Sequence, residues 1–313
     1  MNSRSRPGAG TEERWRVALV VAAITGILAL ARQTIAPGFP SDLDQLWHAA
    51  RALAAGANPY GVVGPGQEFE WAWPVFYPLP AILIVLPFAL FPAHVARIMF
   101  SVLAGGVLGF AMGSRWRVVW PLFLSEAYFL AISRNQWSPF ILAAIWLPAF
   151  GFFAAAKPNI GIIAIAAQTR DTIIRFASLA GGLVVLAFLV RPSWFGEWLS
   201  LVRSAPNKEI ALLQPGGFLL LGALILWRSA EGRILIATAA VPQTPSVYDA
   251  LLLFALCRTR RQALLLAILT HVRRILRCAG QTHGRLGSDP RDAVCARQSW
   301  ILPKADVSAG GRC

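Results

Sequence analysis

Two aspartates, Asp42 and Asp44, follow Ser41 in one of the few acidic stretches of the chain. A carboxylate beside a hydroxyl can act as a general base and take its proton while the oxygen attacks an electrophile. Serine is also a favoured helix N-cap, and carboxylates in a first helical turn offset the helix dipole. Each aspartate is therefore either a candidate base or a residue that stabilises a helix end.

Four further side chains can offer positive charge to an anionic group: Lys157, Arg134, His48 and Arg51. Lys157 stands between an apolar run and a proline, and ionisable residues at membrane depth are usually functional because they are costly. Three of these residues also have a simpler interpretation. The Lys157 side chain would extend to the membrane surface, Arg134 would orient the chain in the membrane, and His48 would be an ordinary surface histidine.

The composition indicates a membrane protein. Hydrophobic residues make up 56% of the 313 positions, and charged residues only 14%, against the ~25% usual for soluble domains. The mean hydropathy is +0.56. The net charge is +14, but the basic residues lie mostly between apolar runs rather than in a basic module with interleaved aromatic residues, which argues against nucleic-acid binding.

The apolar runs predict an all-α integral membrane fold, a polytopic bundle of about 9–11 spans or part-spans. They cover residues 17–36, 79–92, 95–113, 117–133, 138–155, 157–168, 176–190, 211–227, 233–242, 248–257 and 262–275. Several are shorter than the ~20 residues that cross a bilayer, so some must be broken, fused or re-entrant. The prolines, Pro121 and Pro148 among them, fit broken helices.

Basic residues predict which helix ends face the cytoplasm. Residues 1–16 precede a first span without a clear cleavage site, so we expect a cytoplasmic N-terminus and a multi-pass chain in the cell (plasma) membrane. Basic clusters at 170–175, 228–233 and 258–261 then place 37–78, 191–210 and 242–245 on the extracytoplasmic side. Counting spans in this way puts Arg115 and Arg117 on the outer side.

The first outer loop, 37–78, is expected to be structured, and it holds four acidic residues and one arginine. Apolar residues recur at helical spacing from Leu43 to Leu53, Gly56 ends the pattern, and Asn58-Pro59 turns the chain. This predicts a short amphipathic helix on the membrane surface. Aromatic anchors follow at Trp71, Trp73, Phe76 and Tyr77.

The chain thus divides into an N-terminus (1–16), a transmembrane domain (17–276) and a polar, basic tail (277–313). The tail holds three of the four cysteines, at spacings that match no metal motif. It shows neither a helical period nor helix caps. It is either a disordered cytoplasmic tail or the product of a shifted reading frame that replaces further spans.

Several short motifs resemble, in this order, those of the polyprenyl-phosphate-sugar-dependent glycosyltransferases of the GT-C fold, most closely glycosyltransferase family 87, the bacterial membrane mannosyltransferases. The first runs from Asp42 through Arg51-Ala52-Leu53 to Pro59-Tyr60. The later ones are Tyr77-Pro78-Leu79-Pro80, Asn135-Gln136-Trp137-Ser138-Pro139 with Arg134 in place of the family's glycine, Lys157-Pro158-Asn159, and Tyr248-Asp249. The resemblance covers about residues 15–260 and stops where the family continues with further spans.

The resemblance implies an inverting transfer of a sugar, mannose in this family, from a polyprenyl-phosphate donor to a glycolipid or glycan at the extracytoplasmic face, with no metal ion or other cofactor. It implies Asp42 as the general base, with Asp44 as the alternative. It further implies that donor phosphate or substrate is bound by Lys157, Arg134, His48, Arg51, Gln136, Tyr77, Tyr248 and Asp249. The residues alone do not distinguish mannose from arabinose.

Two other classes of protein stay open. A secondary transporter or flippase for a lipid or sugar would use ionisable residues within the spans, such as Glu126 and Lys157, although no internal repeat is visible. The third class is a non-catalytic membrane protein, or a chain inactivated by an altered C-terminal region.

Overall fold

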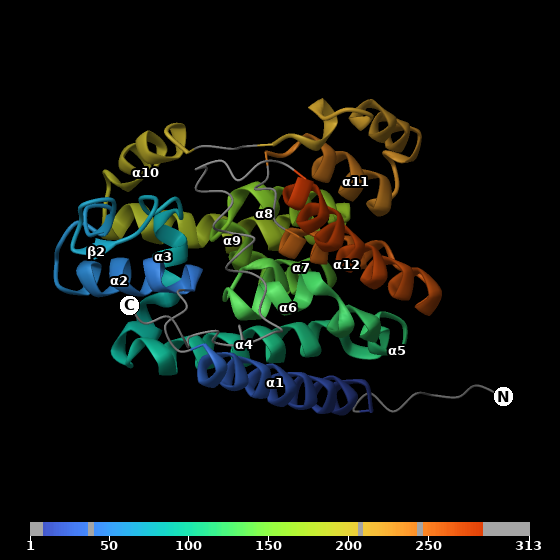
Figure 1. Ribbon diagram of the computed structural model, residues 1–313, viewed down its shortest axis with the longest axis horizontal. Coiled ribbons are helices and arrows are strands. Elements are labelled where there is room, and N and C mark those ends of the chain that lie inside the picture. Colours follow the sequence, from blue (N-terminus) through green and yellow to red (C-terminus); the bar gives the residue numbers. More distant parts are fainter. Residues whose placement is uncertain (1–8, 37–40, 206–208, 243–246, 284–313) are drawn as a thin grey trace, which may run out of the picture.

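The structure is a computed structural model, and it describes residues 9–36, 41–205, 209–242 and 247–283 (Figure 1). The described chain is mostly helical, which agrees with an all-α architecture. Within the described residues, three helical stretches are long and apolar enough to cross a membrane: Gly10–Ile35, Ala93–Leu124 and Arg170–Val190. Shorter apolar helices cover Leu79–Leu90, Gly217–Leu226 and Val247–Leu256.

Helices α1 (Ala9–Ile35) and α4 (Ala93–Met112) lie side by side along one edge of the molecule (Figure 1). Gln33 donates a hydrogen bond to the His94 carbonyl (2.8 Å) near one end of the pair, and Arg14 donates to the Phe110 carbonyl (3.1 Å) near the other. The two helices are therefore antiparallel. Many large apolar side chains of α1 point outward, including Leu19, Ile27 and Leu30.

Helix α2 (Asp42–Ala54) begins where Ser41 predicted it to begin. The Ser41 hydroxyl accepts a hydrogen bond from the Leu43 amide (3.1 Å), and the Asp44 carboxylate accepts one from the Ser41 amide (2.8 Å). This reciprocal pair is a capping box. The predicted end is also confirmed, since Gly56 follows the helix with a φ of 75°, a conformation that glycine adopts at little cost.

The rest of the first loop folds back over α2. Two short strands, β1 (Val63–Gly64) and β2 (Phe69–Glu70), pair with each other. Helix α3 (Leu79–Val85) and the 3-10 helix η1 (Leu86–Leu90) pack against α2. Helix α10 (Trp194–Arg203) joins them, because the Trp198 indole donates to the Phe76 carbonyl (2.9 Å). The two predicted outer segments, 37–78 and 191–210, thus meet at one end of the molecule (Figure 1).

The predicted spans 117–133, 138–155 and 157–168 are helical but broken. They consist of α5 (Trp116–Val119), η3 (Trp120–Leu124), α6 (Glu126–Ser133), α7 (Ser138–Trp146), η4 (Pro148–Ala155) and α8 (Pro158–Ala166). Pro121, Pro139, Pro148 and Pro158 each stand in the first turn of one of these pieces. A proline has no amide hydrogen to donate, so it is tolerated there and disfavoured within a continuous helix.

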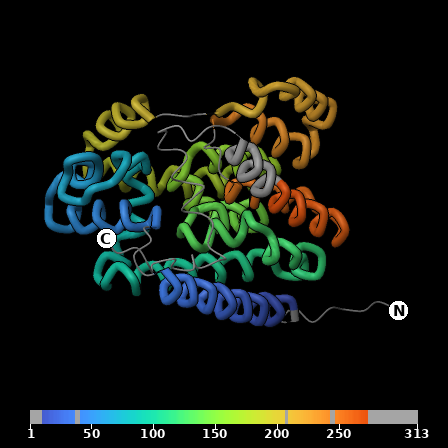
Figure 2. The backbone as a smooth tube through the Cα atoms, viewed as in Figure 1, coloured from blue at the N-terminus to red at the C-terminus, as the bar shows by residue number. Residues whose placement is uncertain are grey.

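The remaining elements complete the bundle. They are η2 (Gly113–Arg115), α9 (Arg170–Val190), η5 (Ala211–Leu213), η6 (Gly217–Leu226), α11 (Ala230–Ala240), η7 (Val247–Leu256) and α12 (Arg260–His283). Figure 2 traces the chain through them, from α1 in blue to α12 in orange. Helix α12 continues past the boundary that the sequence predicted at residue 276. Residues 284–313, most of the predicted tail, lie outside the described residues.

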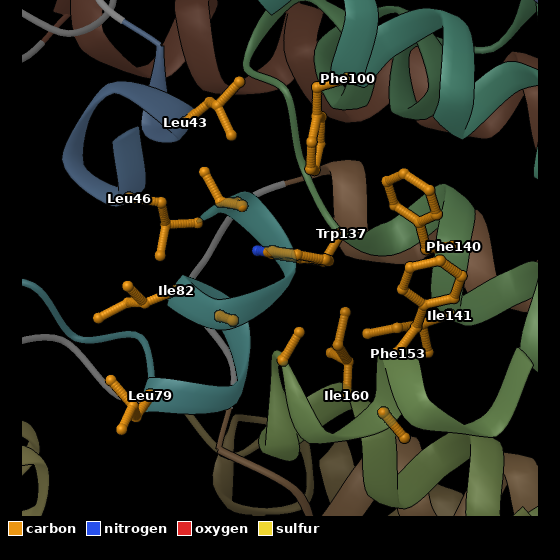
Figure 3. Packing of buried hydrophobic residues seen from close by; sticks show 14 of the residues in the cluster. Leu43, Leu46, Leu79, Ile82, Phe100, Trp137, Phe140, Ile141, Phe153 and Ile160 are labelled. Carbon is orange, nitrogen blue, oxygen red and sulfur yellow. The ribbon is translucent and has the colours of Figure 1, made fainter. Parts of the chain in front are cut away.

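An aromatic core joins the start of α7 to α4 and η4, in the same buried cluster as apolar residues of α2 and α3 (Figure 3). The rings of Phe100 and Trp137 are 5.3 Å apart, and those of Phe140 and Phe153 are 4.4 Å apart. Leu43 and the other apolar residues of α2 belong to the same buried cluster. The amphipathic face that the sequence predicted for α2 therefore packs on protein.

The structure contradicts the count of spans that put Arg115 and Arg117 on the same side as the first outer loop. Arg117 lies 3.3 Å from a Glu13 carboxylate oxygen, at the N-terminal end of α1 and far from α2. The reason is the stretch Leu79–Leu90, which the count treated as a crossing. It is too short to span a bilayer, and it stays at the α2 end of the molecule. Helix α4 therefore starts at the α2 end and brings Arg115 to the end where α1 begins.

Candidate functional site

Asp42 is the first residue of α2, and it meets the link between α6 and α7. Its amide donates to the Arg134 carbonyl (3.2 Å), and its carboxylate accepts a hydrogen bond from the Gln136 side-chain amide. The side chain is half-buried. Burial raises the pKa of Asp42, while the positive charges of Arg134 and Lys157 and the Gln136 hydrogen bond act in the opposite direction.

A second carboxylate, Asp249, forms a buried ion pair with Lys157. The Lys157 ammonium donates to both carboxylate oxygens, at 2.9 and 3.2 Å, and the Ser138 hydroxyl donates to one of them at 3.2 Å. The same ammonium lies 3.5 Å from the Gln136 carbonyl oxygen. Gln136 therefore links Asp42 to the Lys157–Asp249 pair in one continuous polar chain.

Two tyrosines border this polar chain. The Lys157 ammonium lies 4.7 Å from the centre of the Tyr248 ring, within range of a cation–π interaction. The Tyr77 hydroxyl bonds the Gln136 side chain, and burial holds the pKa of Tyr77 well above its ordinary value. Tyr77 therefore keeps its proton at neutral pH and can donate a hydrogen bond.

Each member of the cluster stands at a break in regular structure. Gln136 follows Asn135, whose φ of 51° turns the chain between α6 and α7. Lys157 stands between η4 and α8 with φ −140° and ψ 79°, outside helical geometry. Asp249 lies in the first turn of η7. Broken helices bring polar side chains and free backbone groups to one place inside an apolar bundle.

Asp44 does not join the cluster. Its two carboxylate oxygens accept hydrogen bonds from Arg97, at 2.7 and 2.8 Å, and one of them also caps the Ser41 amide. Both oxygens are thus held by structural contacts. Of the two candidate bases, only Asp42 lies beside Gln136.

His48 and Arg51 also lie away from the cluster. The His48 ring stacks on Phe69 with centroids 3.9 Å apart, and burial lowers its pKa, which favours the neutral imidazole. Arg51 lies 4.9 Å from the centre of the Trp47 ring and donates to the Ala89 carbonyl (3.4 Å). Arg134 lies close enough to Asp42 to influence its pKa. The structure therefore brings together Asp42, Gln136, Lys157, Tyr77, Tyr248 and Asp249, with Arg134 beside them.

No sequence motif assigned a role to Arg97 or Ser101, and none predicted that Asn135 would connect them to the first turn of α2. The Asn135 side chain accepts a hydrogen bond from the Ser41 hydroxyl (2.6 Å) and donates to the Arg97 carbonyl (2.8 Å) and to Ser101 (2.8 Å). Arg32 and Arg97 line a small cavity beside these groups. An arginine within the apolar run 95–113 was the available signal for Arg97, since such residues are costly at membrane depth.

Comparison with protein-family models, curated proteins and solved structures finds no match to this chain. The chemistry open to the chain depends on the cluster around Asp42. That cluster offers a half-buried carboxylate of raised pKa, a protonated tyrosine and two cationic side chains at the end of an apolar bundle. Asp42 can accept a proton, and the two cationic side chains can stabilise negative charge beside it.

Proposed function

We propose that this chain is an integral membrane glycosyltransferase. It transfers a sugar, mannose by the resemblance of its motifs, from a polyprenyl-phosphate donor to a glycolipid or glycan at the extracytoplasmic face. The observation that carries the proposal is the placement of Asp42, half-buried beside Gln136 and connected through it to Lys157 and Asp249. These residues come from motifs spread over more than 200 positions, and they meet in one cluster.

The membrane location is supported by the apolar surface of the helices. Large apolar side chains point outward along α1, α9 and η6, including Ile27, Leu189 and Ile225, which are 67%, 76% and 87% exposed. Soluble proteins rarely leave apolar surface of this extent uncovered. A bilayer covers it, and it would also hold the lipid tail of the donor close to the bundle.

The proposed reaction is a single displacement at the anomeric carbon. The acceptor hydroxyl attacks that carbon while Asp42 takes its proton, and the bond from the carbon to the phosphate oxygen breaks. The polyprenyl phosphate leaves with the bonding electron pair, and the configuration inverts. The raised pKa of Asp42 suits this role, because a base works best when its pKa approaches the ambient pH.

Negative charge on the leaving phosphate needs cationic partners. Lys157 and Arg134 are the nearest candidates, since both act electrostatically on Asp42. Tyr77 keeps its proton and can donate a hydrogen bond to a sugar or phosphate oxygen. In this assignment Asp249 positions the Lys157 ammonium, and Gln136 positions the base.

The proposal is tested with membranes that carry the chain and radiolabelled polyprenyl-phosphate mannose, followed by extraction of labelled lipid and polymer. We expect Asp42→Asn to reduce transfer at least about 100-fold, the lower range of a general-base contribution. Asp171→Asn is the matched control, because Asp171 is an exposed aspartate in the first turn of another helix, α9. Wild-type transfer by Asp42→Asn, at equal amounts of inserted protein, would overturn the assignment.

The buried Lys157–Asp249 pair also fits a second class, a secondary transporter or flippase. Charged pairs inside a helical bundle often border a substrate path. Uptake of a labelled sugar or lipid into proteoliposomes without a labelled transfer product would favour that function. Loss of uptake in the double variant Lys157→Met/Asp249→Leu, at equal amounts of inserted protein, would then connect the activity to this pair.

A further inference from the structure

A cavity of about 420 Å³ lies at the end of the bundle opposite Asp42. It is bounded by residues around α5, the end of α7, the start of α11 and the residues after η7. Its volume falls within the range of about 300–1,000 Å³ that is usual for small-molecule sites. None of its lining residues belongs to the Asp42 cluster, so it would serve a separate ligand.

The wall of the cavity combines apolar and charged side chains. Val119, Trp146 and Ile234 contribute apolar surface, whereas Arg115 and Arg258 contribute guanidinium groups. Glu231 fixes the Arg258 side chain, which donates to one of its carboxylate oxygens at 2.6 and 3.2 Å. Among the residues that the structure describes, none forms an ion pair or a hydrogen bond with the Arg115 side chain.

We propose that this cavity binds one anionic phospholipid. The phosphate would lie between Arg115 and Arg258, and the first part of an acyl chain would follow the apolar wall. Guanidinium groups suit this role because they can donate two hydrogen bonds to one phosphate. The proposal uses the membrane location given above, but it does not depend on sugar transfer.

The position of the cavity favours a membrane lipid over a soluble phosphate ester. Arg115 lies beside Trp116 and Arg117, which contact Glu13 at the N-terminal end of α1. Arg258 lies just before α12 and Arg260 begins it, and Arg260 lies 4.8 Å from the Trp120 ring centre. Basic residues concentrated at one end of a bundle face the anionic lipids of the cytoplasmic leaflet. A soluble ester would bind the same arginines without needing the apolar wall.

The test uses the purified full chain in detergent, mixed with dioleoylphosphatidylglycerol or dioleoylphosphatidylcholine, with bound lipid counted by native mass spectrometry. We expect the wild type to retain the anionic lipid in preference, and Arg115→Gln to bind it about tenfold more weakly. Arg117→Gln is the matched control, since its side chain is 72% exposed at the same end and outside the cavity. We expect its binding to be unchanged.

A third variant, Ala230→Trp, keeps both arginines and fills the cavity, so we expect it to lose the bound lipid. Equal loss in Arg115→Gln and Arg117→Gln would indicate surface charge alone and overturn the proposal, as would full binding by Ala230→Trp. Inorganic phosphate that displaces the lipid at equal concentration would show a phosphate site instead of a lipid site. Because Asp42→Asn should bind the lipid normally, failure here is distinguishable from failure of the transferase proposal.

Discussion

Arg97 and Asp44 form a two-point ion pair, with Arg97 Nε 2.7 Å from Oδ1 and a terminal guanidinium nitrogen 2.8 Å from Oδ2. The pair fastens the first turn of α2 to α4. Asp42 stands in that same turn, two residues earlier, with its amide bonded to the Arg134 carbonyl. The orientation of the candidate base therefore depends on a pair of residues that does not touch it.

We expect Arg97→Gln to destabilise the protein by about 3 kcal/mol, because it leaves the buried Asp44 carboxylate without its charged partner. Thermal unfolding in detergent, followed by tryptophan fluorescence, measures the loss. Arg191→Gln is the control, since Arg191 makes a similar two-point pair with Glu197 in a more exposed position, where about 1 kcal/mol is expected. Equal losses in the two variants would show that the Arg97 pair has no special structural role.

The pH dependence of transfer should follow Asp42. A base works only when it is deprotonated, so transfer activity should fall as the pH drops through the pKa of Asp42. Because burial raises that pKa, the fall should begin at a higher pH than it would for an ordinary aspartate. Arg134→Gln removes a positive charge that lowers this pKa, so the acid limb of the pH–rate profile should move to still higher pH. The initial rate of labelled transfer across pH measures both effects.

Arg51→Gln makes the same charge change on α2 itself, where the guanidinium lies on Trp47 away from the cluster. Its acid limb should coincide with that of the wild type, whatever happens to its maximal rate. If the acid limb lies at the same pH in the wild type and in Arg134→Gln, the group that titrates is not Asp42.

Local structure was the part of the fold that the sequence predicted well. Ser41 and Gly56 set the ends of α2 through contacts within a few residues, so the pattern needed no knowledge of the rest of the chain. The side of Arg115 depended instead on whether Leu79–Leu90 crosses the membrane, and hydropathy alone does not decide that for a stretch so short.

The candidate site, like the fold, could be predicted from the sequence only in part. The motifs singled out Asp42, Gln136, Lys157 and Asp249, yet only the tertiary structure reveals that Lys157 pairs with Asp249, 92 residues away along the chain. The resemblance already favoured Asp42 over Asp44, and the structure adds a physical reason, because Asp44 is paired with Arg97 on a different helix. Helical spacing alone left Asp42 and Asp44 equivalent.

The Lys157–Asp249 pair gives a test that separates folding from chemistry. Lys157→Met or Asp249→Leu alone leaves one buried charge uncompensated, so each should cost about 3–5 kcal/mol and reduce the yield of folded protein. The double variant replaces the pair with apolar side chains, and we expect it to recover much of the yield. Size-exclusion chromatography in detergent measures the folded fraction.

The double variant Lys157→Met/Asp249→Leu should transfer little sugar even where its yield of folded protein is restored, because Lys157 is proposed to face the donor phosphate. The paired variant Arg258→Gln with Glu231→Gln is the control, as it removes an ion pair at the exposed end of the molecule. Wild-type transfer by the Lys157→Met/Asp249→Leu variant would make the pair purely structural.

The last prediction concerns how α1 and α4 meet. Gly105 and Gly109 are four residues apart on α4, a spacing of small residues that lets two helices in a membrane approach closely. A Cβ atom at Gly109 would lie 2.8 Å from the Ala18 Cα atom and 2.9 Å from the Val17 carbonyl oxygen, both of them backbone atoms that cannot move aside cheaply. Gly109→Ala should therefore force the helices apart and cost about 2 kcal/mol, the usual scale of overpacking.

Gly106→Ala provides the matched control on the same helix. A Cβ atom there would meet only the Ala22 methyl group, at an ordinary 3.6 Å. Because alanine favours a helix over glycine by about 0.5–1 kcal/mol, this variant should be as stable as the wild type or slightly more stable. Thermal unfolding of the two variants side by side measures the difference. Equal stability of Gly109→Ala and Gly106→Ala would mean that α1 does not pack on α4 at this distance.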